Sequence, residues 1–128
     1  MIPNEEGILQ DALDYLIENL DEGIYVAPES QNTEAKFPCV LLSVKTAPSV
    51  IGICESLLSE VTIQITIFAD NVYATSDGKY GVLDILDSVN GVMEARHYRR
   101  SNNTKPSFHE QSGRWYKNIW YTKKTNTF

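Results

Sequence analysis

The amino-acid sequence predicts one α+β domain, in which two helices pack on one face of a mixed, mainly antiparallel sheet of four to five strands. The chain has 128 residues, of which 42% are hydrophobic and 22% charged, values typical of a folded domain. Two segments have the periodicity of amphipathic helices, and the others alternate or form apolar runs as strands do. The order is helix, three strands, helix, two strands, and we expect residues 1–128 to form a single domain.

The first element is an amphipathic helix near the N-terminus. Apolar residues recur at spacings of three and four over residues 8–20, and Asp11, Asp14 and Glu18 lie on the other side. Asn4 is the expected N-cap, and the acidic residues that follow it would meet the positive end of the helix dipole. Part of the acidity of this region is therefore ordinary helix chemistry.

Three strands are expected between the two helices. Residues 24–26 form a short one. Residues 37–44 are too apolar to alternate, which predicts a strand covered on both faces, with Pro38 at its beginning. Residues 61–67 alternate apolar with neutral polar side chains, which predicts one buried face. The neutral polar face could either pack against another polar surface or be open to solvent.

The second half of the chain predicts a helix followed by two strands. Apolar spacing indicates a helix over about residues 77–89, with Thr75 or Ser76 as its N-cap and Asn90-Gly91 as its C-terminal stop. Strands are expected over about residues 95–102 and 114–123. They are joined by a polar segment, residues 103–113.

Several classes of protein are excluded by composition. No apolar run is long enough for a transmembrane helix, and the N-terminus is acidic where a signal peptide is positive, so we expect a cytoplasmic protein without membrane contact. Cys39 and Cys54 lack zinc-site spacing and have no neighbouring histidine. We interpret Cys39 as a small buried apolar residue.

The sequence contains no convincing catalytic constellation. It has no G-x-S-x-G elbow and no phosphate-binding glycine loop. Isolated titratable residues occur more often on solvated surfaces than in active sites, so we expect no enzyme activity, cofactor, metal or small-molecule substrate. The residues interpreted in this way are His97, His109, Glu110, Asp84, Asp87 and, as a carboxylate pair, Asp70 with Glu55 or Glu60.

Charge is distributed unevenly along the chain. The net charge is −6, yet residues 1–35 hold nine acids and no base, whereas residues 96–128 hold eight bases and one acid. This composition excludes a nucleic-acid-binding protein that is basic as a whole. It leaves a local basic surface at the C-terminal end.

The basic C-terminal segment is also aromatic, which allows two interpretations. Bases and rings together could bind a phosphate backbone with stacking. Trp, Tyr and Arg are also the residues enriched at protein interfaces. In the last strand neither alternate face is purely basic, so we favour packing on the chain's own helices on one side and on another subunit on the other. One face carries Trp115, Lys117, Ile119, Tyr121 and Lys123, and the other Tyr116, Asn118, Trp120 and Thr122.

The charge separation favours a cyclic homo-oligomer. A patch of one sign cannot pair with its own copy, but in a ring the acidic side of each subunit can meet the basic side of the next. The residues expected at such interfaces are Arg96, Arg99, Arg100, Arg114, Trp115, Trp120, Tyr121, Asp11, Asp14 and Glu18.

The order of elements and several phrases resemble the tail completion proteins of long-tailed bacteriophages, which include tail terminators and tail-to-head joining proteins. The resemblance covers roughly residues 5–123 and rests on pattern, with no invariant catalytic motif. It is carried by the N-terminal amphipathic helix, the strand opened by Phe37-Pro38, the alternating strand 60–68, the helix closing on Asn90-Gly91, and the segment Trp115-Tyr116-Lys117-Asn118-Ile119-Trp120-Tyr121.

This resemblance implies a structural protein of the virion. Its hexameric ring would cap the tail tube, contact the tail tube protein and the head connector proteins, and surround a channel through which DNA passes. Assembly would take place in the host cytoplasm. The alternative is a small nucleic-acid-binding module that uses the basic, aromatic C-terminal strands.

Overall fold

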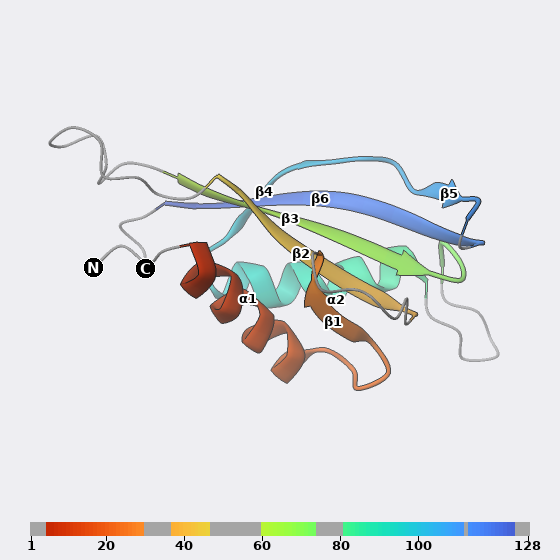
Figure 1. Cartoon of the computed structure of the whole chain (residues 1–128), viewed down its shortest axis with the longest axis horizontal. Helices are drawn as coiled ribbons and strands as arrows, with labels where there is room; N and C mark the ends of the chain where they lie inside the picture. Colours follow the sequence, from red (N-terminus) through yellow and green to blue (C-terminus); the bar gives the residue numbers. More distant parts are fainter. Residues whose placement is uncertain (1–4, 30–36, 47–59, 74–80, 112, 125–128) are drawn as a thin grey trace, which may run out of the picture.

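The computed structural model of the chain describes residues 5–29, 37–46, 60–73, 81–111 and 113–124. They form an α+β domain in which both helices lie on one face of a mixed sheet, as the sequence predicts (Figure 1). The sheet has six strands, one more than expected. The elements are α1 (Glu5–Asn19), β1 (Tyr25–Pro28), β2 (Cys39–Thr46), β3 (Glu60–Ala69), α2 (Val82–Ala95), β4 (Arg99–Asn103), β5 (Ser107–His109) and β6 (Arg114–Lys124).

The sheet is ordered β1-β2-β3-β6-β4, and the short β5 also pairs with β6. The β1–β2 pair is parallel and every other pair is antiparallel. The longest ladder joins β3 to β6 and runs from the Glu60–Lys124 pair to the Ala69–Trp115 pair. Consequently β1 and β4 form the two opposite edges of the main sheet.

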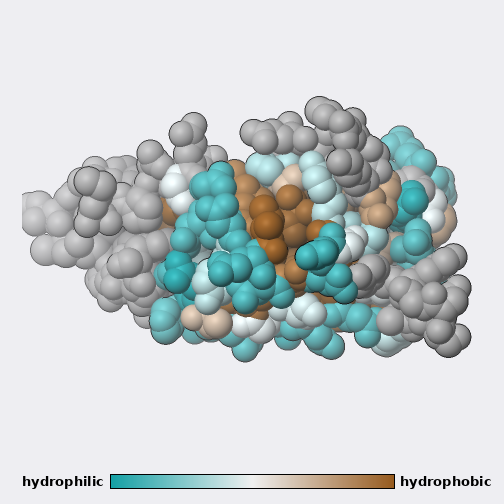
Figure 2. Space-filling view, turned by 90° about the horizontal axis from the view of Figure 1, so that it is seen from below, coloured by the Kyte–Doolittle hydropathy of each residue, from teal (hydrophilic) through white to brown (hydrophobic). Residues whose placement is uncertain are grey.

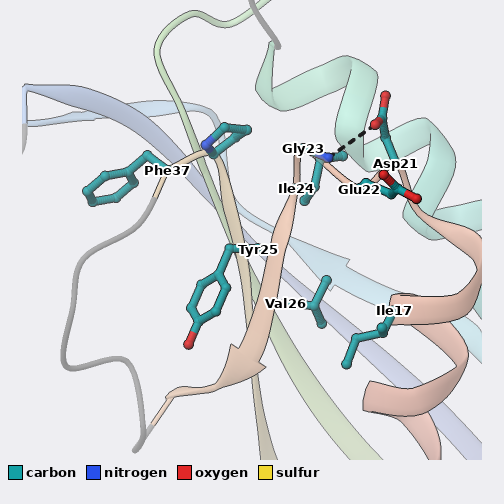
Figure 3. A pocket seen from close by; sticks show the side chains of 9 residues that line it. Ile17, Asp21, Glu22, Gly23, Ile24, Tyr25, Val26 and Phe37 are labelled. Atoms are coloured by element: carbon teal, nitrogen blue, oxygen red, sulfur yellow. Dashed lines mark hydrogen bonds between the residues drawn. The ribbon is translucent and has the colours of Figure 1, made fainter.

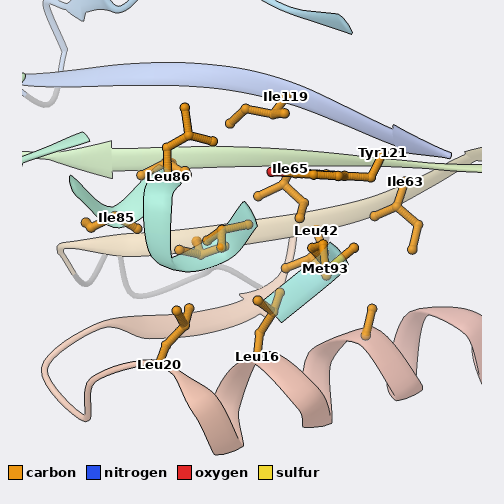
Figure 4. Close-up of a cluster of buried hydrophobic side chains, with 14 of the residues drawn as sticks. Leu16, Leu20, Leu42, Ile63, Ile65, Ile85, Leu86, Met93, Ile119 and Tyr121 are labelled. Carbon is orange, nitrogen blue, oxygen red and sulfur yellow. The ribbon is translucent and has the colours of Figure 1, made fainter. Parts of the chain in front are cut away.

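The central strands bury one face under the helices. Val61, Ile63, Ile65 and Ile67 of β3 are fully buried, which confirms the predicted alternation. Their neighbours on β6 complete the sheet side of the core, shown in Figure 4. We call this the inner face of the sheet, and the opposite face the outer face.

Each helix covers a different part of the inner face. The acidic α1 packs on β1 and β2, whereas α2 packs on β3, β6 and β4. The buried residues of α1 and α2 recur at spacings of three and four, so each helix turns one stripe toward the sheet. These residues are Ile8, Ala12, Leu13 and Leu16 of α1, and Val82, Ile85, Leu86, Val89 and Met93 of α2.

The first half of strand β2 is buried on both faces, as its apolar run predicts, whereas Ser43 and Val44 are partly exposed and Lys45 is exposed. Val40 and Leu42 belong to the main core, whereas Cys39 and Leu41 form a second cluster with Ala27 on the outer face. Cys39 is therefore the buried apolar residue that we expected, and burial raises the pKa of its thiol to about 11. Cys54 lies outside the described residues.

The second helix departs from its predicted bounds. It does not stop at Asn90-Gly91 but continues to Ala95, because Met93 extends the apolar stripe by another turn and is buried. Gly91 is exposed, and a Cβ added there would meet no atom within 4 Å. The described helix begins at Val82 with Gly81 as its N-cap residue. The expected N-caps Asn4, Thr75 and Ser76 lie outside the described residues.

The two strands expected after this helix are also shifted. Residue 95 still belongs to α2, and the strand predicted over 95–102 begins only at Arg99. His97 lies in the intervening turn with φ of 69°, where it is exposed as expected, although not on a strand. The polar segment 103–113 contains β5, which has one apolar residue in three and hence no readable alternation.

Candidate assembly surfaces

An aromatic group lies on the outer face of the sheet. Phe68 of β3 stacks on Tyr116 of β6 with ring centroids 5.6 Å apart, and Phe37 meets Phe68 edge to face at 5.8 Å. The ring of His109 packs edge-on against Phe68 at 5.6 Å and against Tyr116 at 6.0 Å. We call these four residues the outer aromatic cluster. Both described helices lie on the other face of the sheet (Figure 1).

Arg114 borders the outer aromatic cluster and is already engaged within the chain. Its guanidinium carbon lies 3.9 Å from the centre of the Phe37 ring, a cation–π contact. Its Nε lies 3.2 Å from Oδ1 of Asp70. Asp70 therefore neutralises a base of the C-terminal segment.

Polar side chains continue the outer face beside the rings. Thr66 Oγ1 donates a hydrogen bond to Asn118 Oδ1 at 2.7 Å, and Gln64 lies beside both. Together with the rings and Arg114 they line an open hollow of about 770 Å³. An apolar floor with a few polar groups suits recognition of another macromolecular surface.

One acidic and one basic residue expected at the subunit interfaces form an ion pair within a single chain. Arg96, which follows α2, directs one guanidinium nitrogen at both carboxylate oxygens of Asp11, at 2.9 and 3.1 Å. The guanidinium also lies 4.6 Å from the centre of the Tyr15 ring. The hydrogen bonds to Asp11 raise the pKa of Arg96 further above its ordinary value. This pair links α1 to the end of α2, so part of the charge separation is neutralised within one chain.

We expect Asp11→Ala to lower the free energy of unfolding by about 0.5–1 kcal/mol, because the pair is partly exposed and solvent screens it. The loss should shrink when NaCl is raised to about 1 M. Asp14→Ala is the matched control on the same helix, since Asp14 is exposed and accepts a hydrogen bond from Gln10, its neighbour one turn away. Urea unfolding at both salt concentrations measures the difference, and equal losses for the two variants would contradict the assignment.

The aromatic candidates of β6 divide between the two faces. Tyr121 is fully buried, and its hydroxyl donates to Oδ1 of Asn90 on α2. The structure thus corrects its assignment as an interface residue, because no part of it reaches the surface of this chain. Trp115 packs against the main core and meets Phe108 edge to face at 5.6 Å. Trp120 is partly exposed, at a position that alternates with Tyr121.

Two lysines of the basic segment are buried, which the sequence interpretation missed. Lys117 is 7% exposed, and its Nζ donates to Asn103 Oδ1 at 3.1 Å and to the Thr104 carbonyl at 2.7 Å. Lys123 is 5% exposed and lies 5.1 Å from the centre of the Tyr98 ring. Burial lowers the pKa of both ammonium groups. Both lysines share one face of β6 with Ile119, and this alternation is the sequence feature that could have indicated their burial.

The remaining charged candidates lie at opposite edges of the sheet. Arg99 and Arg100 of β4 are exposed at one edge. Asp14 and Glu18 are exposed on α1, which packs on β1 and β2 at the other edge. The charge separation along the sequence therefore becomes a charge separation across the sheet.

The residues described by the structure contain no group of three or more potential metal ligands. Asp84 and Asp87 are exposed on α2, as expected, and Glu55 lies outside the described residues. Within the same described ranges, no helix has the length and apolar character needed to cross a membrane.

No protein-family model matches the chain, and no curated protein is significantly similar to it.

Proposed function

We propose that this chain is a non-enzymatic assembly protein whose copies join head to tail in a closed ring. The observation that supports this most is the placement of exposed charge. Acidic residues lie on α1 beside one edge of the sheet, and Arg99 and Arg100 lie on the opposite edge. Opposite charges on opposite edges favour contact between unlike surfaces of identical copies.

A two-fold dimer built on one of these edges would not pair the acidic edge with the basic edge. In such a dimer one edge faces the same edge of its copy, so either two acidic edges or two basic edges would meet. A contact between unlike surfaces instead leaves a free acidic and a free basic edge at the ends of every open chain of copies. Rotation between successive copies can then close the chain into a ring.

We further propose, from the resemblance to tail completion proteins, that the ring is a hexamer at the end of a bacteriophage tail tube. Its partners would be the tail tube protein and the head connector proteins, and DNA would pass through it in the virion. The outer aromatic cluster and its polar neighbours offer a surface for such partners, since the helices lie on the other face.

The structure weakens the case for a nucleic-acid-binding module. Arg96 and Arg114 are paired with carboxylates, and Lys117 and Lys123 are buried. Among the described bases of the C-terminal segment this leaves Arg99, Arg100 and Lys105 exposed. If the alternative held, DNA binding would weaken steeply with salt and would be lost in Arg99→Ala with Arg100→Ala.

The proposed function predicts an oligomer of defined size. Light scattering at increasing protein concentration should give a mass several times the 14.5 kDa of the chain, and negative-stain images should show rings. Because the contact is electrostatic, the oligomer should dissociate more readily as salt is raised. A chain that stays monomeric at every concentration and does not bind purified tail tubes would refute the proposal.

A further inference from the structure

A groove lies at the beginning of β1, whose edge away from β2 pairs with no strand in the part of the chain that the structure describes. The groove has a volume of about 740 Å³ and lies between the end of α1 and the segment that leads into β2 (Figure 3). Seen from the helix side, the molecule also presents an apolar patch among hydrophilic residues (Figure 2). Ile17 of α1, which lines the groove, is 57% exposed. Exposed apolar surface rimmed by polar residues is typical of an interaction site.

The backbone of β1 can accept a further strand. The Tyr25 N–H donates to the Pro38 carbonyl at 3.0 Å, toward β2. Since successive peptide groups of a strand point in opposite directions, those of Val26 point away from β2 and toward the groove. An edge of this kind is a template for pairing with another strand.

The side chains of the groove suit alternate residues of such a strand. Tyr25 and Phe37 lie on one side of β1, whereas Ile17 and Val26 lie on the other, as Figure 3 shows. An added strand sends successive side chains to opposite faces, so it would contact both groups. The groove therefore spans the sheet edge rather than opening on one face.

The charges around the groove favour a basic occupant. Asp21 and Glu22 line it, and no lysine or arginine is among the described residues that do so. Glu18 is exposed one turn earlier on α1. The Asp21 carboxylate also accepts a hydrogen bond from the Gly23 N–H at 3.1 Å, which fixes the turn that carries these acids.

Strand β4 has the complementary properties. All five of its residues are exposed, and none is apolar. Its pairing register puts Arg100 opposite Tyr121, on the inner side, and Arg99 opposite Thr122, on the outer side. The register shifts between Arg100 and Asn102, a bulge that discourages indiscriminate edge pairing. A partner edge must therefore offer matching charge.

The strand directions are compatible with a continuous sheet. β1 is parallel to β2, and three antiparallel pairings lead from β2 to β4, so β1 and β4 run in opposite directions. Copies placed edge to edge with the same face outward would then form an antiparallel β4–β1 pair.

We propose that β4 of one copy lies in the β1 groove of the next, which specifies the interface of the proposed ring and rests on that proposal. Arg100 then faces Glu18 and Glu22 on the helix side. Arg99 faces the Tyr25 ring on the outer side, where a guanidinium can stack. Each copy contributes one acidic and one basic edge, so no charged edge is left over in a closed ring.

Complementary charge reversal tests this interface in the full-length chain. We expect Glu18→Lys with Glu22→Lys to be monomeric in light scattering, and Arg99→Glu with Arg100→Glu to be monomeric as well. One variant then has two basic edges and the other two acidic edges. Their equimolar mixture should return to the mass of the wild-type oligomer with the two chains alternating, which an even-numbered ring permits.

Reversals away from the groove control for net charge. Asp87→Lys with Glu94→Lys matches the first variant, and Lys45→Glu with Lys105→Glu matches the second, all at exposed positions. Both controls should keep the wild-type mass, and circular dichroism should show all four variants folded. If the groove and β4 variants remain oligomeric, or if their mixture stays monomeric, the interface is wrong although the ring proposal stands. A wild-type chain that is always monomeric overturns both.

Discussion

Tyr121→Ala is expected to lower the free energy of unfolding by about 3–5 kcal/mol, the range typical of removing a buried aromatic side chain. Tyr121 is fully buried between β6 and the helices, so the truncation leaves a cavity. It also leaves Asn90 without the hydroxyl that it binds on α2. Urea unfolding followed by circular dichroism measures the loss.

The neighbouring residue provides a matched control. Trp120 is at least as large as Tyr121 but is partly exposed at an alternate position of the same strand. Trp120→Ala should therefore cost about 1 kcal/mol or less. Tyr121→Phe keeps the ring and loses only the hydroxyl, so it should cost about 1–2 kcal/mol. Equal losses for Tyr121→Ala and Trp120→Ala would show that the inner face has been assigned to the wrong residues.

Alkaline pH is expected to destabilise the fold, with about 2–3 kcal/mol lost between about pH 9 and pH 11 through Cys39 alone. Burial raises the pKa of this thiol from 9.0 to about 11, because the thiolate would lose its hydration, and nearby Arg114 offsets this only in part. The folded chain therefore holds the thiol proton where the unfolded chain releases it. This contribution is complete below pH 9.0 and is lost as the pH rises through about 11.

Other buried titratable groups also change the stability at alkaline pH, two in the same direction as Cys39 and two in the opposite direction. Burial raises the pKa of Tyr98 and Tyr121, so stability falls further above pH 10.0. Burial lowers the pKa of Lys117 and Lys123, which acts in the opposite direction as the pH approaches 10.5. The unfolding free energy of Cys39→Ala should be lower at about pH 8 yet fall less steeply from about pH 9 to pH 11. Parallel pH profiles for the variant and the wild type would refute the role of Cys39.

The strands were predictable where the apolar pattern is either a clean alternation or an unbroken run. In β3, isoleucine and valine alternate with threonine and glutamine, so the pattern identified both the strand and its buried face. The apolar run at the start of β2 likewise predicted burial on both sides for residues 39–42. In these segments local periodicity and tertiary packing agree.

The candidate residues were less predictable where both faces of a strand are mixed. The alternation in β6 showed which residues share a face but not which face meets the helices. Lys117 and Lys123 concealed the inner face, since lysine is rarely buried, and this made Tyr121 resemble an interface residue. The Asp11–Arg96 pair joins residues 85 positions apart, and no local pattern indicates such a contact. The end of α2 was misplaced because Asn-Gly is a frequent stop signal that the apolar stripe overrides here.

The central position of β3 also has a consequence for how the chain folds. β3 and β6 are adjacent in the sheet, yet α2, β4 and β5 lie between them in the sequence, so their pairing must close a long loop. Domains dominated by such distant contacts fold in milliseconds to seconds rather than microseconds. Throughout that interval β3 lacks one of its two neighbours, and its central residues are uncharged, mostly β-branched and free of proline. The strand that supplies the centre of the core is thus an aggregation hazard until β6 has been synthesised and has paired with it.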